Sequence, residues 1–336
     1  YISNNELIIV GNGGKILKSF DGGTTWSDLT TGIGGGGLLQ DISFINDNVG
    51  FTVGWFGDIY KTTNGGTNWI SKISGTDKEL FSISWINSMD AVIVGNSGTI
   101  LKTTDGGNNW TNISDKYFGS SIGAVAVAPS DESILYVGEG ENTMRGNVSE
   151  GLGGIWRSED GGRSWKNMGL KDARHIIRII IHPRNPDIVW VAAMGHLFGP
   201  NEERGVYKTT DGGKTWARTL YVNNQTGCSD LVMEPRNPYV FYAGPWRLIR
   251  THYSLESGGE GSGLWKSTDS GDTWPNISAR SATRANRGGF RSAKERVFKS
   301  VRLTCRTRCA RPPLEDAFFR GAKDDLTYVA AKRYRC

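Results

Sequence analysis

The sequence predicts an all-β fold, a β-propeller of four-stranded antiparallel blades, from three observations. Six close copies of one octapeptide, which has a terminal Trp and, in four of the copies, an Asp-Gly-Gly core, occur within the 336 residues. Each copy follows a short run in which apolar and polar residues alternate, which is the pattern of a β-strand. The spacings between the six Trp residues are 43, 41, 55, 51 and 58 residues. Periods of about 40 to 50 residues with strand patterning are typical of one propeller blade per repeat.

Each octapeptide is predicted to be a hairpin turn between the third and fourth strands of a blade. Its acidic side chain is an acceptor for nearby backbone N–H groups, and its glycines tolerate the positive φ of a tight reversal. The Trp begins the return strand and packs across the hairpin. Asn64 can accept the same bonds without a charge, which favours a structural role over catalysis. That role is assigned to Asp21 and Trp26, Asn64 and Trp69, Asp105 and Trp110, Asp160 and Trp165, Asp211 and Trp216, and Asp269 and Trp274.

The first three blades are short. In the second blade the strands are expected at 38–46, 49–54, 57–63 and 67–73, and in the third at 81–86, 91–95, 99–104 and 108–113. The first blade starts at its second strand, residues 7–11. Its missing strand is expected from upstream sequence or from a C-terminal strand that closes the ring.

The last three blades use a second turn device between their first two strands. Proline-containing turns occur at 128–131, 182–186 and 234–238, and each precedes an apolar strand. Proline fixes φ and Asn or Asp closes such a turn. Three longer blades therefore follow three short ones.

The repeats carry two resemblances. The octapeptides resemble Asp-boxes, also called bacterial neuraminidase (BNR) repeats. Residues 120–278 resemble sortilin-like BNR-repeat propeller proteins of bacteria that are often described as glycosyl hydrolases, most clearly at 127–142, 153–169 and 205–216. Residues 1–114 resemble the repeats of photosystem II assembly-factor-like propellers, found in many bacterial secreted proteins. The resemblances imply the fold and an exported protein, extracellular or periplasmic, whose targeting segment is not present in this chain.

We divide the chain into short-repeat blades at 1–114, longer-loop blades at 115–278 and a basic tail at 279–336. The tail holds 16 basic and 5 acidic residues, whereas the preceding part holds 23 and 29. The tail shows no octapeptide and no clear strand alternation. It is interpreted as disordered or not native to the fold, with a basic arm for nucleic acid as the alternative.

A candidate binding face follows from the order of the strands. The proline turns and the octapeptides share one side of a blade, so the loops between strands two and three lie on the other. These loops are tiny in the first three blades but extend over 139–153, 195–204 and 244–262 in the last three. Long loops gathered on one propeller face are a usual place for a ligand.

The side chains of these loops suit recognition of a polysaccharide or of a protein or peptide ligand, because aromatic and Arg residues stack on sugars or bind carboxylates. The candidate ligand-binding residues are Glu139, Glu141, Arg145, His196, Glu202, Glu203, Arg204, Trp246, Arg247, Arg250, His252 and Tyr253. Their polarity is equally explained by solvation of long loops.

The leading functional hypothesis is a binding or interaction module, because the repeats are structural and no catalytic constellation is evident. The alternative is a glycoside hydrolase, sialidase- or xyloglucanase-like, which needs two carboxylates about 5 to 9.5 Å apart. Pairs could be built from Glu139, Glu141, Glu202 and Glu203, but the sequence does not select one. No cofactor, metal site or membrane span is expected, and a structural role is favoured for His175 and His182.

Overall fold

The computed structural model describes residues 6–30, 37–114, 117–141, 149–234, 237–251 and 254–278, and the backbone of 328–330. The fold is an all-β propeller with six four-stranded antiparallel blades, as predicted. Helical structure in the described residues is limited to four three-residue turns, η1 to η4. The chain divides into two compact units, with the boundary after Val125, and each is described by itself.

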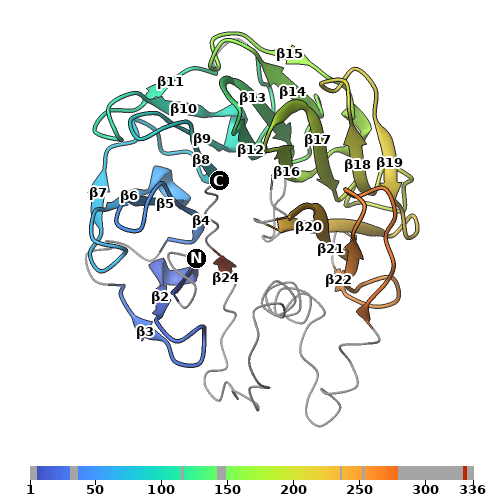
Figure 1. The fold of residues 1–336 in the computed structure, drawn as a ribbon, viewed down its shortest axis with the longest axis horizontal. Coiled ribbons are helices and arrows are strands. Elements are labelled where there is room, and N and C mark those ends of the chain that lie inside the picture. The colour runs from blue at the N-terminus through green and yellow to red at the C-terminus, as the bar shows by residue number, and fades with distance from the viewer. Residues whose placement is uncertain are drawn as a thin grey trace. The chain divides into compact units, whose positions relative to one another are not determined.

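The first unit holds three blades (Figure 1). The second blade consists of β4 (Leu39–Phe44), β5 (Gly50–Gly54), β6 (Ile59–Thr62) and β7 (Ile70–Lys72). The third consists of β8 (Leu80–Trp85), β9 (Ala91–Gly95), β10 (Ile100–Thr103) and β11 (Thr111–Asn112). All eight strands lie within a few residues of their predicted positions.

The first blade receives a strand from the far end of the chain. It consists of β1 (Leu7–Gly11), β2 (Ile16–Ser19), β3 (Ser27–Asp28) and β24 (Tyr328–Ala330). The pairing of β24 with β1 is antiparallel, with Val10 opposite Val329. A C-terminal strand was one of the two predicted sources. The sequence of the tail did not locate this strand, because three residues are too few to show an alternation; the rest of 279–336 lies outside the described residues.

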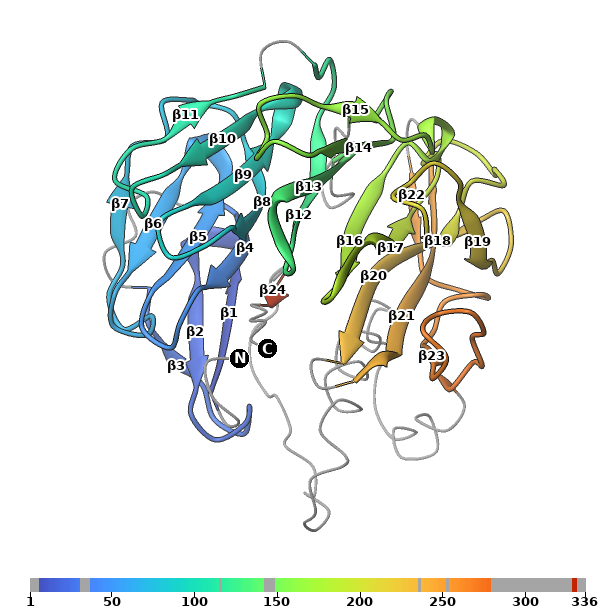
Figure 2. The same cartoon turned by 45° about the horizontal axis from the view of Figure 1, so that its top comes forward.

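The second unit holds three blades with longer first and second strands (Figure 2). The fourth consists of β12 (Ile122–Ala128), β13 (Asp131–Glu139), β14 (Ile155–Ser158) and β15 (Lys166–Asn167). The fifth consists of β16 (Ile176–His182), β17 (Asn185–Ala193), β18 (Gly205–Thr209) and β19 (Ala217–Leu220). The proline turns lie between the first two strands, where His182 pairs with Asn185 and Glu234 with Asn237.

The sixth blade differs from its prediction in one loop. It contains β20 (Thr226–Glu234), β21 (Asn237–Arg250) and β23 (Trp265–Ser267), with Asn276 bridged to Trp265 at the fourth position. Residues 244–262 were expected to be a loop, but β21 continues through them and pairs with β22 (Leu255–Ser257). The strand continues because Trp246 and Leu248 lie two residues apart, on one face of the strand, and bury their side chains against Met194 and Leu197.

The core lies between neighbouring blades of each unit. In the first unit Phe51, Val53 and Ile59 of the second blade pack on Leu80, Ile83, Ile93 and Leu101 of the third. In the second unit Trp190 of the fifth blade packs on Phe241 of the sixth, with 4.5 Å between ring centroids. Sheets that pack face to face in this way exclude water from both faces, which is the main stabilising contribution of a propeller.

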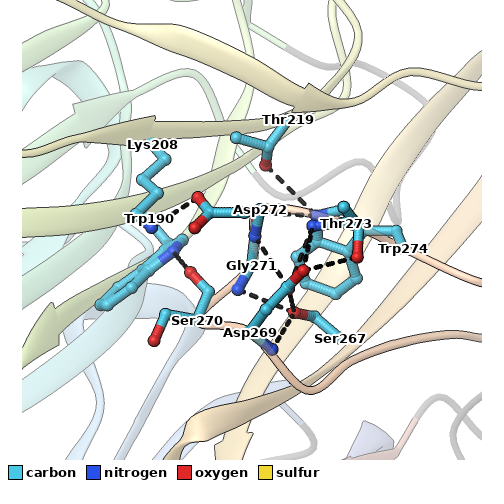
Figure 3. Close-up of polar contacts among 10 residues, drawn as sticks. All are labelled: Trp190, Lys208, Thr219, Ser267, Asp269, Ser270, Gly271, Asp272, Thr273 and Trp274. Carbon is cyan, nitrogen blue, oxygen red and sulfur yellow. Dashed lines mark hydrogen bonds and ion pairs between the residues drawn. The ribbon is translucent and has the colours of Figure 1, made fainter.

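The octapeptide turns are held by local hydrogen bonds, as Figure 3 shows for the sixth blade. The carboxylate of Asp269 accepts from the N–H groups of Asp272 and Thr273 at 3.2 and 3.0 Å and from the Thr273 hydroxyl at 2.5 Å. Ser267 donates to the same carboxylate at 2.6 Å. Burial raises the pKa of Asp269, but the bonds from Ser267 and Thr273 outweigh it and leave the pKa at about 2. Asn64 accepts from the N–H of Asn68 at 2.9 Å in the corresponding place.

A further bond links three of the turns to the preceding blade. The donor of this bond is the Lys or Arg that lies one position before the octapeptide of the preceding blade. Its side chain donates to the backbone carbonyl of the first turn glycine in the next blade: Lys18 to Gly65 at 2.8 Å, Lys61 to Gly106 at 2.7 Å and Arg157 to Gly212 at 3.3 Å. In the sixth blade Ser270 replaces that glycine; its carbonyl accepts from Trp190 and Lys208 binds Asp272 instead (Figure 3). We call this contact the interblade bond.

Candidate binding site on the long loops

The long loops of the second unit, residues 139–153, 195–204 and 244–262, are here called the loop platform. Residues 142–148 and 252–253 lie outside the described residues, so the predictions for Arg145, His252 and Tyr253 have no structural counterpart. Hydrogen bonds connect the three loops within this unit. The connections identify which of the predicted residues hold the loops and which face solvent.

Glu139 holds the first loop. Its side chain is buried at the end of β13, and its carboxylate accepts three hydrogen bonds: from the N–H of Leu152 at 2.9 Å, the N–H of Gly153 at 2.8 Å and the indole of Trp156 at 2.7 Å. Glu141 is also fully buried, and its N–H donates to Ser149 at 3.2 Å across the loop. A carboxylate engaged by three donors has its lone pairs directed into the protein.

His175 connects the first loop to the second. It is fully buried, and its Nδ1 lies 3.1 Å from the carbonyl oxygen of Glu141. The carbonyl of His175 accepts from Met194 at 2.9 Å, directly before the second loop. Burial lowers the pKa of His175 to about 4, because the charged ring loses its hydration; the bond to Glu141 opposes this effect. His175 is therefore neutral at pH 7.

Arg204 connects the second loop to the third. Its guanidinium is fully buried and donates to the carbonyl oxygens of His196, Gly199, Gln225 and Leu248. The bonds to Gln225 and Leu248 measure 3.1 and 3.5 Å. Burial lowers the pKa of Arg204 to about 10, so the group stays charged at pH 7. A planar cation surrounded by carbonyls fixes the path of two loops at once.

The third loop presents a charged pair. Arg247 donates to the side-chain oxygen of Gln225 at 3.0 Å and to Glu256 on β22 at 3.0 Å. The Glu256 side chain is 58% exposed. Trp246 is buried beside Leu248, and the N–H of Arg250 donates to Leu197 of the second loop at 3.2 Å.

The exposed part of the loop platform is mixed in character. Leu152 of the first loop is 63% exposed and Phe198 of the second is 48% exposed. Glu202 is exposed beside Arg218, whose guanidinium stacks over the ring of Tyr221 at 4.0 Å. Glu203 and His196 are half-buried.

The loop platform thus separates the predicted residues into two groups. Glu139, Glu141, Arg204 and Trp246 are buried, while Glu202, Arg247 and Arg250 have exposed surface. Sequence reasoning did not identify Leu152 or Phe198, because it selected charged, His, Trp and Tyr residues of the loops, and it did not consider Tyr221, which lies outside them. Contact of any of these residues with a ligand stays a prediction. In the part of the chain that the structure describes, no group of three or more His, Cys, Asp or Glu residues is placed to hold a metal ion.

Two family models match the sequence. The model described as photosynthesis system II assembly factor YCF48 matches residues 30–202, just over half of the chain. The model described as sortilin, neurotensin receptor 3, matches residues 153–308. Both resemblances inferred from the repeats are confirmed. A search of curated proteins gave no match.

Several solved structures share the fold. YCF48 bound to D1 peptide is 19% identical with a TM-score of 0.57, covering 82% of this chain and 78% of that chain. YCF48 from Cyanidioschyzon merolae is 18% identical with a TM-score of 0.56, covering 82% of both chains. The GH74 xyloglucanase from Xanthomonas campestris is 13% identical with a TM-score of 0.59, covering 82% of this chain and 44% of that chain. At these identities the likeness concerns the fold. Among the described residues, no helix has the length and apolar character to cross a membrane.

Proposed function

Since the chain belongs to the family described as photosynthesis system II assembly factor YCF48, we propose that it is a binding module whose loop platform takes a segment of another protein. The proposal includes the exported location expected from the resemblance of residues 1–114. Detection of the protein in the extracellular or periplasmic fraction of its source cells supports that location, and its recovery in the cytoplasmic fraction contradicts it.

The observation that carries the proposal is the burial of Glu139, His175 and Arg204. These three side chains direct their polar atoms inward and fix the loops to one another. A fixed frame lowers the entropy that a ligand must remove on binding. What remains exposed, Leu152 and Phe198 together with charged pairs, is the composition of a protein interface, where apolar anchors are surrounded by a polar rim.

The burial of the loop carboxylates counts against the glycosidase alternative. That alternative is considered because the fold resembles that of GH74 enzymes. A glycosidase acid or nucleophile must reach the scissile bond. Glu139 is 3% exposed with three donors on its carboxylate, and Glu141 is fully buried. Glu202 and Glu203 are adjacent residues of one loop, so they do not supply carboxylates from two loops.

A selection from a phage-displayed peptide library tests the proposal, with the full chain as the immobilised target. Peptides recovered on the unmodified protein should lose at least tenfold in affinity for the double variant Leu152→Ser, Phe198→Ser. Tyr239→Ser is the matched control, because Tyr239 is a 59% exposed aromatic residue of the same unit, on β21 directly after the proline turn. Equal losses in both variants, or no enriched peptide, contradict the proposal. Release of reducing sugar from xyloglucan that Glu202→Gln abolishes would establish the glycosidase instead.

A further inference from the structure

The short loops of the first unit share one three-residue turn, in which one blade departs from the other two. The turns are Asn12–Gly14, Trp55–Gly57 and Asn96–Gly98. Their central residue is left-handed in each case: φ is 69° at Gly13, 61° at Phe56 and 54° at Ser97. In the first and third blades the leading Asn accepts a bond from the next N–H, at 2.8 Å for Gly13 and 2.7 Å for Ser97.

The turn of the second blade lacks the leading Asn and has a bulky residue at the left-handed position. Trp55 replaces the Asn and has no oxygen to accept that N–H. Phe56 places a bulky side chain at a left-handed φ, a conformation that is an outlier for such residues. The ring is 70% exposed, so burial does not offset the strain. An exposed aromatic residue held in a strained turn contributes little to folding, and such outliers gather at binding sites.

The surroundings of Phe56 are polar. The ring of Trp55 is perpendicular to it, with 6.2 Å between centroids, and no described residue accepts from the indole N–H of Trp55. Asp58 follows the turn and is half-exposed; burial raises the pKa of Asp58. The turn of residues 74–76 packs against Gly57, where an added Cβ would meet the Thr76 carbonyl. Beyond it lie Asp77 and Lys78, which form an exposed pair at 3.3 Å.

We propose that the Trp55–Phe56 turn is a carbohydrate-binding site that stacks a neutral hexopyranose unit of a polysaccharide on the ring of Phe56. A pyranose has an apolar C–H face and a rim of hydroxyls. The exposed ring matches the face, because an aromatic face attracts C–H groups. The half-exposed carboxylate of Asp58 matches the rim as an acceptor, whereas the indole N–H of Trp55 is buried and does not face the ligand.

The same features disfavour two other occupants. In a protein interface several apolar anchors share one polar rim, whereas this turn exposes a single large apolar side chain, Phe56. An anionic membrane surface attracts basic clusters, whereas Asp58 and Asp77 outnumber Lys78 here. The site is independent of the loop platform, so the two proposals succeed or fail separately.

Titration calorimetry of the full chain with cellohexaose and mannohexaose tests the site. We expect binding of at least one oligosaccharide and a loss of at least tenfold in affinity in Phe56→Gly. The same variant should gain about 2 °C in melting temperature, because glycine adopts the left-handed turn without strain. A stabilised variant that no longer binds separates a functional residue from a structural one.

Met89→Ser is the control, since Met89 is a 50% exposed apolar residue of the same unit in the turn between β8 and β9; its affinity should be unchanged. Trp55→Asn, which restores the Asn of the other two blades, should also weaken binding. The proposal is overturned if neither oligosaccharide binds, or if Phe56→Gly binds as well as the unmodified chain. The last measurement is binding to vesicles of phosphatidylcholine and phosphatidylglycerol. If the chain binds these vesicles only when Phe56 is present and does not bind the oligosaccharides, the carbohydrate proposal is overturned in favour of a membrane surface.

Discussion

The ammonium group of Lys18 lies 2.8 Å from the carbonyl oxygen of Gly65, so that a side chain of the first blade ends in the octapeptide turn of the second. Lys18 is only 4% exposed and also lies 3.1 Å from Glu6. Gly65 has a φ of 68° and donates its own N–H to Asn48. The octapeptide is therefore both a turn within its blade and an acceptor for the preceding blade.

Removal of this interblade bond should destabilise the first unit. In Lys18→Met the carbonyl of Gly65 loses its charged donor, and we expect the free energy of unfolding to fall by about 2 kcal/mol. Urea denaturation measures the loss. The control is Lys15→Met, whose partner Asp28 lies at 2.5 Å with both side chains nearly half exposed; exposed pairs contribute about 0.2 to 1 kcal/mol. Similar losses in both variants would argue against the interblade bond.

Asparagine should replace aspartate in an octapeptide at a smaller cost than alanine. In Asp160→Asn the remaining oxygen can still accept from Ser164 and Ser158, as Asn64 accepts from Asn68 and Thr62. In Asp160→Ala these donors lose their acceptor, and we expect a loss of about 1 kcal/mol, kept small by solvent exposure. The melting temperatures of the two variants decide the matter. Equal destabilisation would mean that the charge, rather than the hydrogen bonds, holds the turn.

Acid should destabilise the second unit in two steps. The pKa of His175 is lowered to about 4, below the ordinary value of about 6.5. The unfolded chain therefore binds this proton first, and stability is complete above pH 6.5 and falls as the pH approaches 4. The loss is about 1.4 kcal/mol per pH unit, or about 3 kcal/mol in all. Denaturation across pH 7 to 4 should show this slope, and His175→Gln should remove most of it.

A second step follows below pH 4. The pKa values of Asp160 and Asp269 are lowered to about 2 by the hydrogen bonds of their turns, which outweigh the opposing effect of burial. The contribution of these two carboxylates to stability is present above the unfolded carboxyl pKa and is lost as the pH falls toward 2.

His182→Gln is the control for the first step, the one assigned to His175. Burial lowers the pKa of His182 as well, but His182 lies partly exposed in a turn. A slope between pH 7 and 4 that survives in His175→Gln contradicts the assignment.

Loss of the Arg204 guanidinium should loosen the second and third loops together. Arg204→Met leaves four carbonyl oxygens without their donor, and we expect a destabilisation of about 3 kcal/mol. Amide hydrogen exchange should accelerate in residues 196–201 and at Leu248. Arg218→Met, which removes a more exposed arginine of the same unit, should leave the exchange at Leu248 unchanged. Faster exchange confined to the second loop would mean that Arg204 does not connect the two.

Local hydrogen bonding explains how far the sequence predicted this molecule. The turn at Asp269 is made by atoms within eight residues, so its sequence encodes it directly. Glu139 was predicted to be an accessible loop residue, either ligand-binding or solvated, yet its three donors come from residues 13 to 17 positions away. The burial of Arg204 likewise depends on a carbonyl 44 positions away. The charge of a loop residue is known from the sequence, but its solvent exposure depends on the tertiary contacts that it makes.

The acceptor of the interblade bond is a backbone carbonyl, and this matters for the evolution of a repeat protein by duplication of its blades. A carbonyl is present whatever side chain the residue carries, so a lysine at the end of one repeat finds its acceptor in any repeat that keeps the turn. Ser270 shows the tolerance, since its carbonyl still accepts an incoming N–H from the fifth blade. A blade that is duplicated in the gene can therefore form the interblade bond with its new neighbours at once. The octapeptide can also change in sequence without losing this bond.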